Sequence, residues 1–202
     1  MQFDFKDTSF LVRHKILNYG VTPRVIAWIS SVNEKGDVNL SPYDFFAPMS
    51  VDPIIFSVGF FPKSNGETKD TFENIIRTKK ASICMCNFEL LPKMHQSAQE
   101  FDQDVSEAIE LDIPLEIATS SYPPIPKGVS LAFMCDLFQV IKINKNSKIL
   151  LLEAKKYYID EKVFKTNFEF EIHNASRMGK TYQIKDHLID QKTLKEVKKK
   201  FS

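Results

Sequence analysis

Residues 68–71 combine two hydroxyl groups, an amino group and a carboxylate in the order Thr-Lys-Asp-Thr. Apolar residues at helical spacing follow them, so a short amphipathic helix is predicted over residues 70–79. The free N–H groups and the positive dipole end at a helix start attract anions, and a lysine adds a full charge. We interpret Lys69, Asp70 and Thr71 as a candidate phosphate site; the alternative is a plain helix-capping cluster.

A second candidate segment follows a predicted hairpin strand and reads Asn-Leu-Ser-Pro-Tyr-Asp-Phe-Phe over residues 39–46. Polar groups in such a run can hydrogen-bond the edge of a heterocycle while aromatic side chains cover its face. The alternative is that these aromatic residues belong to the core. The candidate site residues here are Asn39, Ser41, Tyr43, Asp44, Phe45 and Phe46.

A third candidate is a polar segment over residues 173–182, which contains an arginine, a glycine and a tyrosine. Its Gly179-Lys180-Thr181 run lacks the glycine that a P-loop requires five residues earlier, where Asn174 stands. The alternative interpretation is a surface turn. Its candidate site residues are Arg177, Met178, Gly179 and Tyr182.

The cysteine pair Cys84 and Cys86 has the spacing of two residues on one face of a strand. A structural zinc site needs about four ligands, and no second half is recognisable among Cys135 and the histidines. We therefore predict core cysteines and no metal site.

These candidates must be positioned by a mainly β fold with inserted helices. Alternating and β-branched runs predict strands, an acidic stretch predicts a solvated helical excursion, and lysine-rich periodicity predicts a terminal helix. Because strands and helices do not alternate regularly, a closed or nearly closed barrel is favoured over a parallel sheet. The predicted strands cover residues 24–32, 38–41, 53–61, 81–87, 129–143 and 148–159, the excursion 88–112 and the terminal helix 190–201.

Composition narrows the function classes. The 202 residues carry 27 Lys and Arg against 26 Asp and Glu, a formal charge of +1 that favours neither nucleic acid nor an anionic membrane as a partner. Only 6 glycines are present and no G-x-G-x-x-G occurs, which excludes a Rossmann phosphate turn. We expect a single domain over residues 1–202, with its core at about 10–185, in a cytoplasmic protein with reduced thiols.

Taken in chain order, five segments resemble the flavin reductase-like family of FMN-binding split-barrel proteins. No single segment is decisive, and the order and spacing carry the resemblance over roughly residues 10–185. The segments are Arg24 to Ser31, Asn39 to Phe46, Asp52 to Gly59, Lys69-Asp70-Thr71 with Asn74, and Arg177-Met178-Gly179 with Tyr182.

The resemblance implies a homodimeric split β-barrel with FMN bound near the interface between subunits. It places Ser30 and Ser31, with residues 69–71, on the phosphate and ribityl side of the flavin. It places residues 39–46 around the isoalloxazine ring and residues 177–182 beside the flavin. In a homodimer, either subunit could supply residues 177–182.

The implied reaction is hydride transfer from NADH or NADPH to flavin, with electrons passed on to a second flavin or another acceptor. Stacking of two rings requires no acid or base, so no catalytic side chain is expected. Two alternatives remain open: an FMN-binding electron-transfer or storage protein without NAD(P)H activity, and a barrel without flavin.

The chain departs from the family pattern at three positions. Val25 replaces a common proline, and Lys180 replaces a second glycine after Gly179. Asp44 stands where serine or threonine is common, so a carboxylate would either lower the reduction potential of the flavin or face solvent.

Overall fold

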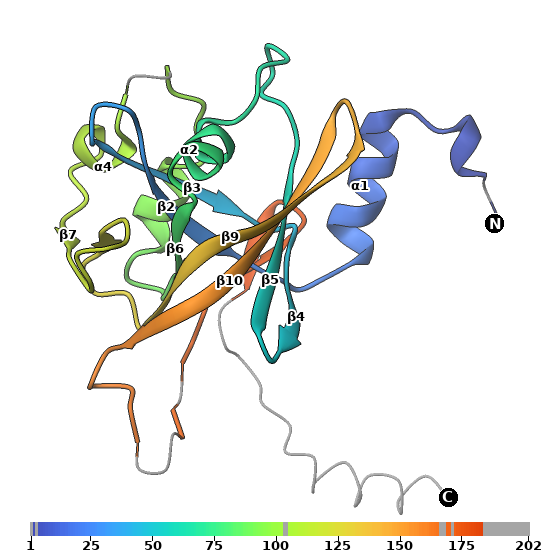
Figure 1. Ribbon diagram of the computed structural model, residues 1–202. Helices are drawn as coiled ribbons and strands as arrows, with labels where there is room; N and C mark the ends of the chain where they lie inside the picture. The colour runs from blue at the N-terminus through green and yellow to red at the C-terminus, as the bar shows by residue number, and fades with distance from the viewer. Residues whose placement is uncertain (1, 3, 103–104, 166–168, 171, 184–202) are drawn as a thin grey trace, which may run out of the picture.

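The computed structural model describes residues 2, 4–102, 105–165, 169–170 and 172–183 (Figure 1). Its centre is a seven-stranded antiparallel sheet with the strand order β3-β2-β6-β9-β10-β5-β4. The strands are β2 (Ala27–Val32), β3 (Val38–Tyr43), β4 (Phe46–Val51), β5 (Ile54–Phe60), β6 (Lys80–Met85), β9 (Leu131–Asn144) and β10 (Ser147–Ile159).

The outer strands of this sheet, β3 and β4, are consecutive in the sequence, and only Asp44 and Phe45 lie between them. The sheet therefore curls until its two edges meet at this link, which we call the seam. Side chains from β2, β3, β5, β6, β9 and β10 fill the interior as one apolar cluster that includes Ile29, Phe56 and Leu150. The expected mainly β fold with inserted helices is confirmed.

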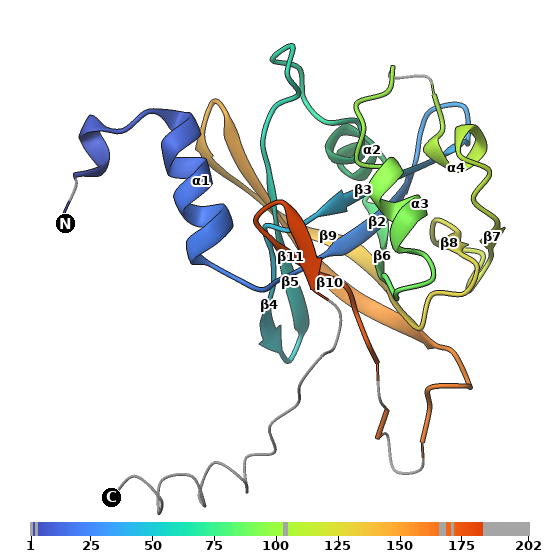
Figure 2. The same cartoon turned by 180° about the vertical axis from the view of Figure 1, so that it is seen from behind.

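A second apolar cluster lies on the outer face of β2, β3 and β6, around the buried Trp28. It is covered by the excursion between β6 and β9, which contains α3 (Leu91–Gln96), α4 (Glu107–Glu110), β7 (Leu115–Glu116) and β8 (Ile125–Pro126). Figure 2 shows these elements together beside β2, β3 and β6. The excursion was predicted to be helical and solvated, but both helices are short and Glu107 is buried, so this prediction is wrong in part.

Three elements frame the seam. Helix α2 (Asp70–Thr78) packs against β2 and β3 and matches the predicted helix 70–79. Helix α1 (Phe10–Gly20), preceded by the short η1 (Phe5–Asp7), stands at the side of the barrel in both views (Figures 1 and 2). A small sheet in the order β1 (Arg24–Val25), β11 (Ser176–Met178) and β12 (Thr181–Gln183) brings the predicted polar segment 173–182 back to the start of the barrel.

The predicted strand 24–32 is two strands, β1 and β2, which join different sheets. The predicted strand 38–41 extends to Tyr43 as β3, and Phe46 begins β4, a strand that was not predicted. The other predicted strands are confirmed, and the predicted helix 190–201 lies outside the described residues. No helix in the described part of the chain is long and apolar enough to cross a membrane.

Candidate functional site

The seam encloses a cavity of about 140 Å³, which we call the seam cavity. The outer strand β3, the link, the end of β5, the start of α2 and the segment after α3 line it, with the residues Ser41, Pro42, Tyr43, Asp44, Phe45, Gly59, Phe61, Lys69 and Ala98. A larger hollow of about 580 Å³ shares four of them, Asp44, Phe45, Gly59 and Phe61, and extends towards α1 and the tip of the β9–β10 hairpin. Because typical ligand pockets measure roughly 300–1,000 Å³, the seam cavity alone holds only part of a large ligand.

Phe45 is held in place by β5. The Gly59 N–H donates to the Phe45 carbonyl oxygen at 2.8 Å. A Cβ atom at position 59 would lie 3.0 Å from the Phe45 Cβ, so glycine lets β5 approach the link closely. The Phe45 ring meets the Phe61 ring edge-on at 4.9 Å, which gives the cavity an aromatic wall.

The neighbouring Asp44 does not carry an unpaired charge. Its Oδ2 accepts from the Arg24 guanidinium at 2.8 Å and 3.3 Å. Arg24 also donates to the carbonyl oxygens of Leu17, Asn18 and Val21 at the end of α1. The arginine therefore neutralises the seam carboxylate and caps the helix with the same group.

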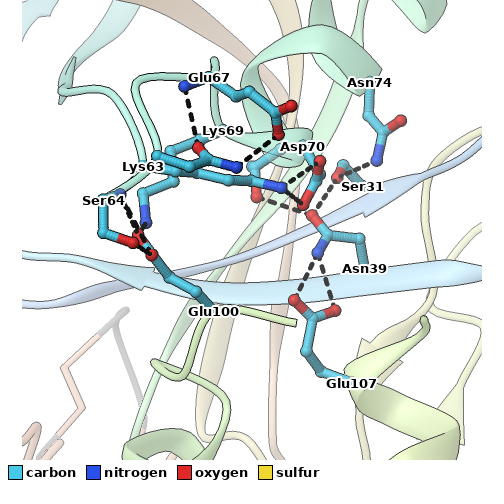
Figure 3. Close-up of polar contacts among 12 residues, drawn as sticks. Ser31, Asn39, Lys63, Ser64, Glu67, Lys69, Asp70, Asn74, Glu100 and Glu107 are labelled. Carbon is cyan, nitrogen blue, oxygen red and sulfur yellow. Dashed lines mark hydrogen bonds and ion pairs between the residues drawn. The ribbon is translucent and has the colours of Figure 1, made fainter. Parts of the chain in front are cut away.

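Beneath the seam, three predicted site residues and Asn74 form a buried network with one residue from the excursion (Figure 3). Asn39 Oδ1 accepts from the Thr71 hydroxyl at 2.7 Å and from the Ser31 hydroxyl at 3.1 Å. Asn39 Nδ2 donates to both Glu107 carboxylate oxygens, at 2.6 Å and 2.7 Å, and Asn74 Nδ2 donates to Ser31 Oγ at 3.3 Å. These amide and hydroxyl groups therefore bind one another and fix β2, β3, α2 and α4 together.

Glu107 also accepts from the Leu40 N–H at 2.9 Å, on the free edge of β3. Its carboxylate thus satisfies a backbone donor that an edge strand leaves without a strand partner. Burial raises the pKa of Glu107, while the hydrogen bonds from Leu40 and Asn39 act in the opposite direction.

Ser30 and Ser31 do not share a site, because adjacent residues of a strand face opposite sides of the sheet. Ser31 faces Asn39, whereas the Ser30 hydroxyl donates to the Pro124 carbonyl oxygen at 2.6 Å on the outer face. Ser30 therefore binds the excursion and points away from the seam.

At the start of α2, Lys69 occupies the N-cap position without a side-chain capping bond, so the capping-cluster alternative is wrong. Lys69 Nζ lies 2.7 Å from Glu100 Oε1, and Glu100 also accepts from the backbone N–H and hydroxyl of Ser64. Asp70 pairs with Lys63 at 2.8 Å. A cation, a hydroxyl and a backbone N–H thus converge on one carboxylate beside the seam cavity.

The C-terminal segment contributes a second polar cluster. Arg177 donates to the Tyr182 hydroxyl at 2.8 Å, and the same oxygen lies 2.8 Å from His95 Nδ1. Burial raises the pKa of Tyr182, against the lowering effect of Arg177. Met178 is partly exposed at 37 %.

Gly179 anchors this segment to α1. Its N–H donates to the Asn18 carbonyl oxygen at 3.1 Å, its φ is +56°, and a Cβ atom would lie 2.3 Å from the Tyr19 ring. A side chain at position 179 would therefore clash with α1. The surface-turn alternative holds in part, since Gly179 and Lys180 form the turn of the β11–β12 hairpin with Lys180 exposed, while Gly179 is buried against α1.

The three cysteines are free and buried, which confirms the core prediction. Within the described ranges, no group of three or more His, Cys, Asp or Glu side chains is arranged to hold a metal ion.

Several contributors to the site were not predicted from the sequence, and they include Ser64, Glu100 and Glu107. Both glutamates lie in the acidic stretch interpreted as a solvated face, and their partners are 31 to 68 residues away in the chain. No local spacing signals such pairs.

Comparison with known families decides what this barrel is. The model of the "Flavin reductase like domain" matches residues 19–176. The chain belongs to the flavin reductase-like family.

Solved structures agree with this family at the level of the fold. Nitrilotriacetate monooxygenase component B from Bacillus cereus superposes with a TM-score of 0.88 at 18% identity, over 94% of this chain and 98% of the other. A split-barrel protein from Shewanella frigidimarina, described as a flavin reductase, gives 0.79 at 19% identity, with 94% and 98% covered. An FMN-binding protein from Thermus thermophilus gives 0.73 at 16% identity, with 94% and 98% covered. The flavin reductase-like chain therefore has the split-barrel fold.

Proposed function

We propose that this flavin reductase-like protein binds FMN at the seam and transfers hydride from NADH or NADPH to the flavin. The observation that supports this most strongly is the position of Lys69, which both heads α2 and lines the seam cavity. FMN joins an anionic phosphate to an aromatic ring system through a short chain. The phosphate matches the cation Lys69, and the ring system matches the aromatic wall of the seam cavity.

The residues fit FMN in two groups. Lys69 and Ser64 already hold an anion, the Glu100 carboxylate, and would hold the phosphate with charge-assisted bonds. Ser41, Asp44 and Phe45 line the seam cavity and would meet the ring.

The remaining candidate residues near the seam would support the site without contacting FMN. Ser31, Asn39 and Thr71 bind one another under the seam and would position β3 and α2 rather than touch the cofactor. Tyr43 is directed into the barrel, where its ring lies 4.6 Å from that of Phe60, and Phe46 packs on Phe56.

Bound flavin would supply the redox chemistry, accepting a hydride and passing electrons to a second flavin or another acceptor. The chain's own residues would hold the ring still and exclude water from one face. Because Arg24 neutralises Asp44, this carboxylate would add little negative potential to the flavin, which argues against the first of the two alternatives, a lowered reduction potential.

We further propose that the protein is a homodimer in which a second copy covers α1 and completes the flavin site. None of the eleven residues of α1 is buried, and Phe10, Leu11 and Ile16 are 65%, 70% and 44% exposed. A helix with apolar residues on all sides is ordinarily covered. The large hollow runs from α1 to Phe45, so a copy seated there would enlarge the cavity wall.

Analytical ultracentrifugation tests the dimer. We expect a dimer of the wild-type protein and dissociation in the variant Leu11→Glu, which places a charge on α1. The matched control is Ile117→Glu, which changes an equally exposed residue (71%) on the excursion. A monomeric wild type, or equal dissociation of both variants, would contradict the proposed interface.

Anaerobic mixing of FMN-loaded protein with NADH or NADPH tests the reaction. Loss of the visible flavin absorbance with either donor is expected. Binding of FMN without loss of absorbance would identify an electron-transfer or storage protein instead, and failure to take up FMN would refute the proposal altogether.

Binding titrations test the site. Lys69→Ala should weaken FMN much more than riboflavin, because a charge-assisted hydrogen bond contributes about 1.5–3 kcal/mol and riboflavin has no phosphate. Lys142→Ala, which changes an exposed lysine on β9, is the control. Equal weakening of both ligands by Lys69→Ala would contradict the phosphate assignment.

A further inference from the structure

The Glu100 carboxylate is bound in the manner of a ligand. Both of its oxygens lie 3.2 Å from the Ser64 backbone nitrogen, Oε2 accepts from the Ser64 hydroxyl, and Oε1 lies 2.7 Å from Lys69 Nζ (Figure 3). The donors come from the segment between β5 and α2, whereas Glu100 follows α3. Two segments about 30 residues apart are thus held together by one anion.

These donors are of kinds that proteins present to a phosphate oxygen: the backbone N–H and hydroxyl of Ser64, in the loop before α2, and the ammonium of Lys69 at the start of this nine-residue helix. The Glu100 carboxylate and a phosphate cannot both occupy this position beside Lys69, because the two anions would overlap and repel each other. The nearby Lys63 is already paired with Asp70. Lys69 is therefore the cation for which the Glu100 carboxylate and a phosphate would compete.

We infer that Glu100 occupies the place of the flavin phosphate and has to leave it when FMN binds, so that Glu100 is an internal competitor that sets the preference between FMN and riboflavin. This inference rests on the proposed flavin function. When FMN binds, its phosphate replaces the Glu100 carboxylate on Ser64 and Lys69, so the charge of Lys69 stays paired. The released Glu100 carboxylate, which is already 36% exposed, passes into water.

The charge of Glu100 persists across neutral pH. The hydrogen bond from Lys69 and those from Ser64 lower the pKa of Glu100 to about 2, so protonation does not release it near pH 7. Near pH 7, only a competing anion or a substitution of Glu100 frees the donors of Ser64 and Lys69.

Titration of flavin-free protein with FMN and with riboflavin tests the competition, with quenching of the single tryptophan, Trp28, as the signal. Glu100→Gln keeps the size of the side chain and removes its charge. When Glu100 blocks a fraction of the sites, the apparent Kd for FMN rises in inverse proportion to the fraction that remains open. We therefore expect Glu100→Gln to bind FMN about fivefold or more tightly than wild type, and riboflavin within about twofold of wild type. Glu100→Ala should act in the same direction.

Glu67→Gln is the matched control, because its carboxylate lies in the same loop and accepts from Asn65. Its FMN affinity should equal that of wild type. Unchanged or weaker FMN binding by Glu100→Gln would overturn the competition, and an equal gain for riboflavin would show that the phosphate is not involved. If neither wild type nor Glu100→Gln bound any flavin, the proposed function would fail instead.

Discussion

Replacing Glu107 by alanine removes the acceptor that joins α4 to β3. The Asn39 amide would lose both of its carboxylate contacts, at 2.6 Å and 2.7 Å, and the Leu40 N–H would lose its contact at 2.9 Å. Asn39 is 6% exposed and Leu40 is fully buried, so water cannot readily replace the carboxylate. Two buried donor groups would be left without partners.

The expected effect follows from these two groups. A buried donor without a partner costs about 1–3 kcal/mol, so two groups amount to about 2–6 kcal/mol. Removal of a carboxylate whose burial is itself unfavourable offsets part of that loss. We expect the free energy of unfolding to fall by about 2–4 kcal/mol, a large share of the 5–15 kcal/mol typical of a domain.

Urea unfolding followed by Trp28 fluorescence measures the change, with the slope m required to stay constant. Glu110→Ala is the matched control, because it changes an exposed glutamate in the same helix and should stay within about 0.5 kcal/mol of wild type. A loss for Glu107→Ala as small as that of the control would refute the reasoning, since Asn39 and Leu40 would then have other partners.

The same residue predicts a pH dependence of stability. Because the pKa of Glu107 is raised on folding, the folded state binds more protons than the unfolded state between the ordinary value of 4.5 and the raised value. The contribution of Glu107 to stability is therefore fully present below pH 4.5 and is lost as the pH rises through the folded pKa. The stability of wild type relative to Glu107→Gln should fall over this window; a constant or rising difference would contradict the raised pKa.

Two further substitutions test how α1 is attached. Gly179→Ala should lower stability by about 1–2 kcal/mol from the left-handed backbone alone, plus the clash with Tyr19; urea unfolding in a Tyr19→Ala background should show the backbone part only. Gly20→Ala, which meets open space, is the control, and an equal effect would contradict the packing argument. Arg24→Ala removes the cap of α1 and leaves Asp44 unpaired, so hydrogen exchange of the α1 amides should accelerate while that of β9 stays unchanged; equal protection of α1 in both proteins would show that Arg24 does not hold the helix.

Periodicity was sufficient to predict the β2–β3 and β9–β10 hairpins and α2, because those signals are local, whereas β4 and the β11–β12 hairpin were missed. The predicted strand 38–41 ends just before Pro42, whereas β3 continues through this proline to Tyr43. In the structure β3 is an outer strand, where proline is tolerated because one side lacks strand partners, and Pro48 in the opposite outer strand β4 follows the same rule. Strand order is a tertiary property, so the sequence did not reveal which prolines were permitted.

The candidate site was predicted in its parts rather than in its connections. Ser31 and Thr71 were predicted on the phosphate side of a flavin and Asn39 at its ring, whereas in the structure these three side chains bind one another. Glu107, their common anchor with Asn39, was missed because an isolated glutamate in an acidic stretch is ordinarily solvated. Long-range pairing of this kind leaves no pattern in a single sequence.

The two-residue link between β3 and β4 has a mechanical consequence. Opening of the barrel separates its outer strands most where the chain does not tie them, and least at Asp44 and Phe45, where the chain itself joins them. The seam therefore acts as a pivot, about which the far ends of β3 and β4 swing while the walls next to Phe45 keep their spacing. The cavity lies beside this link, where the chain itself limits how far the two edges of the barrel can separate.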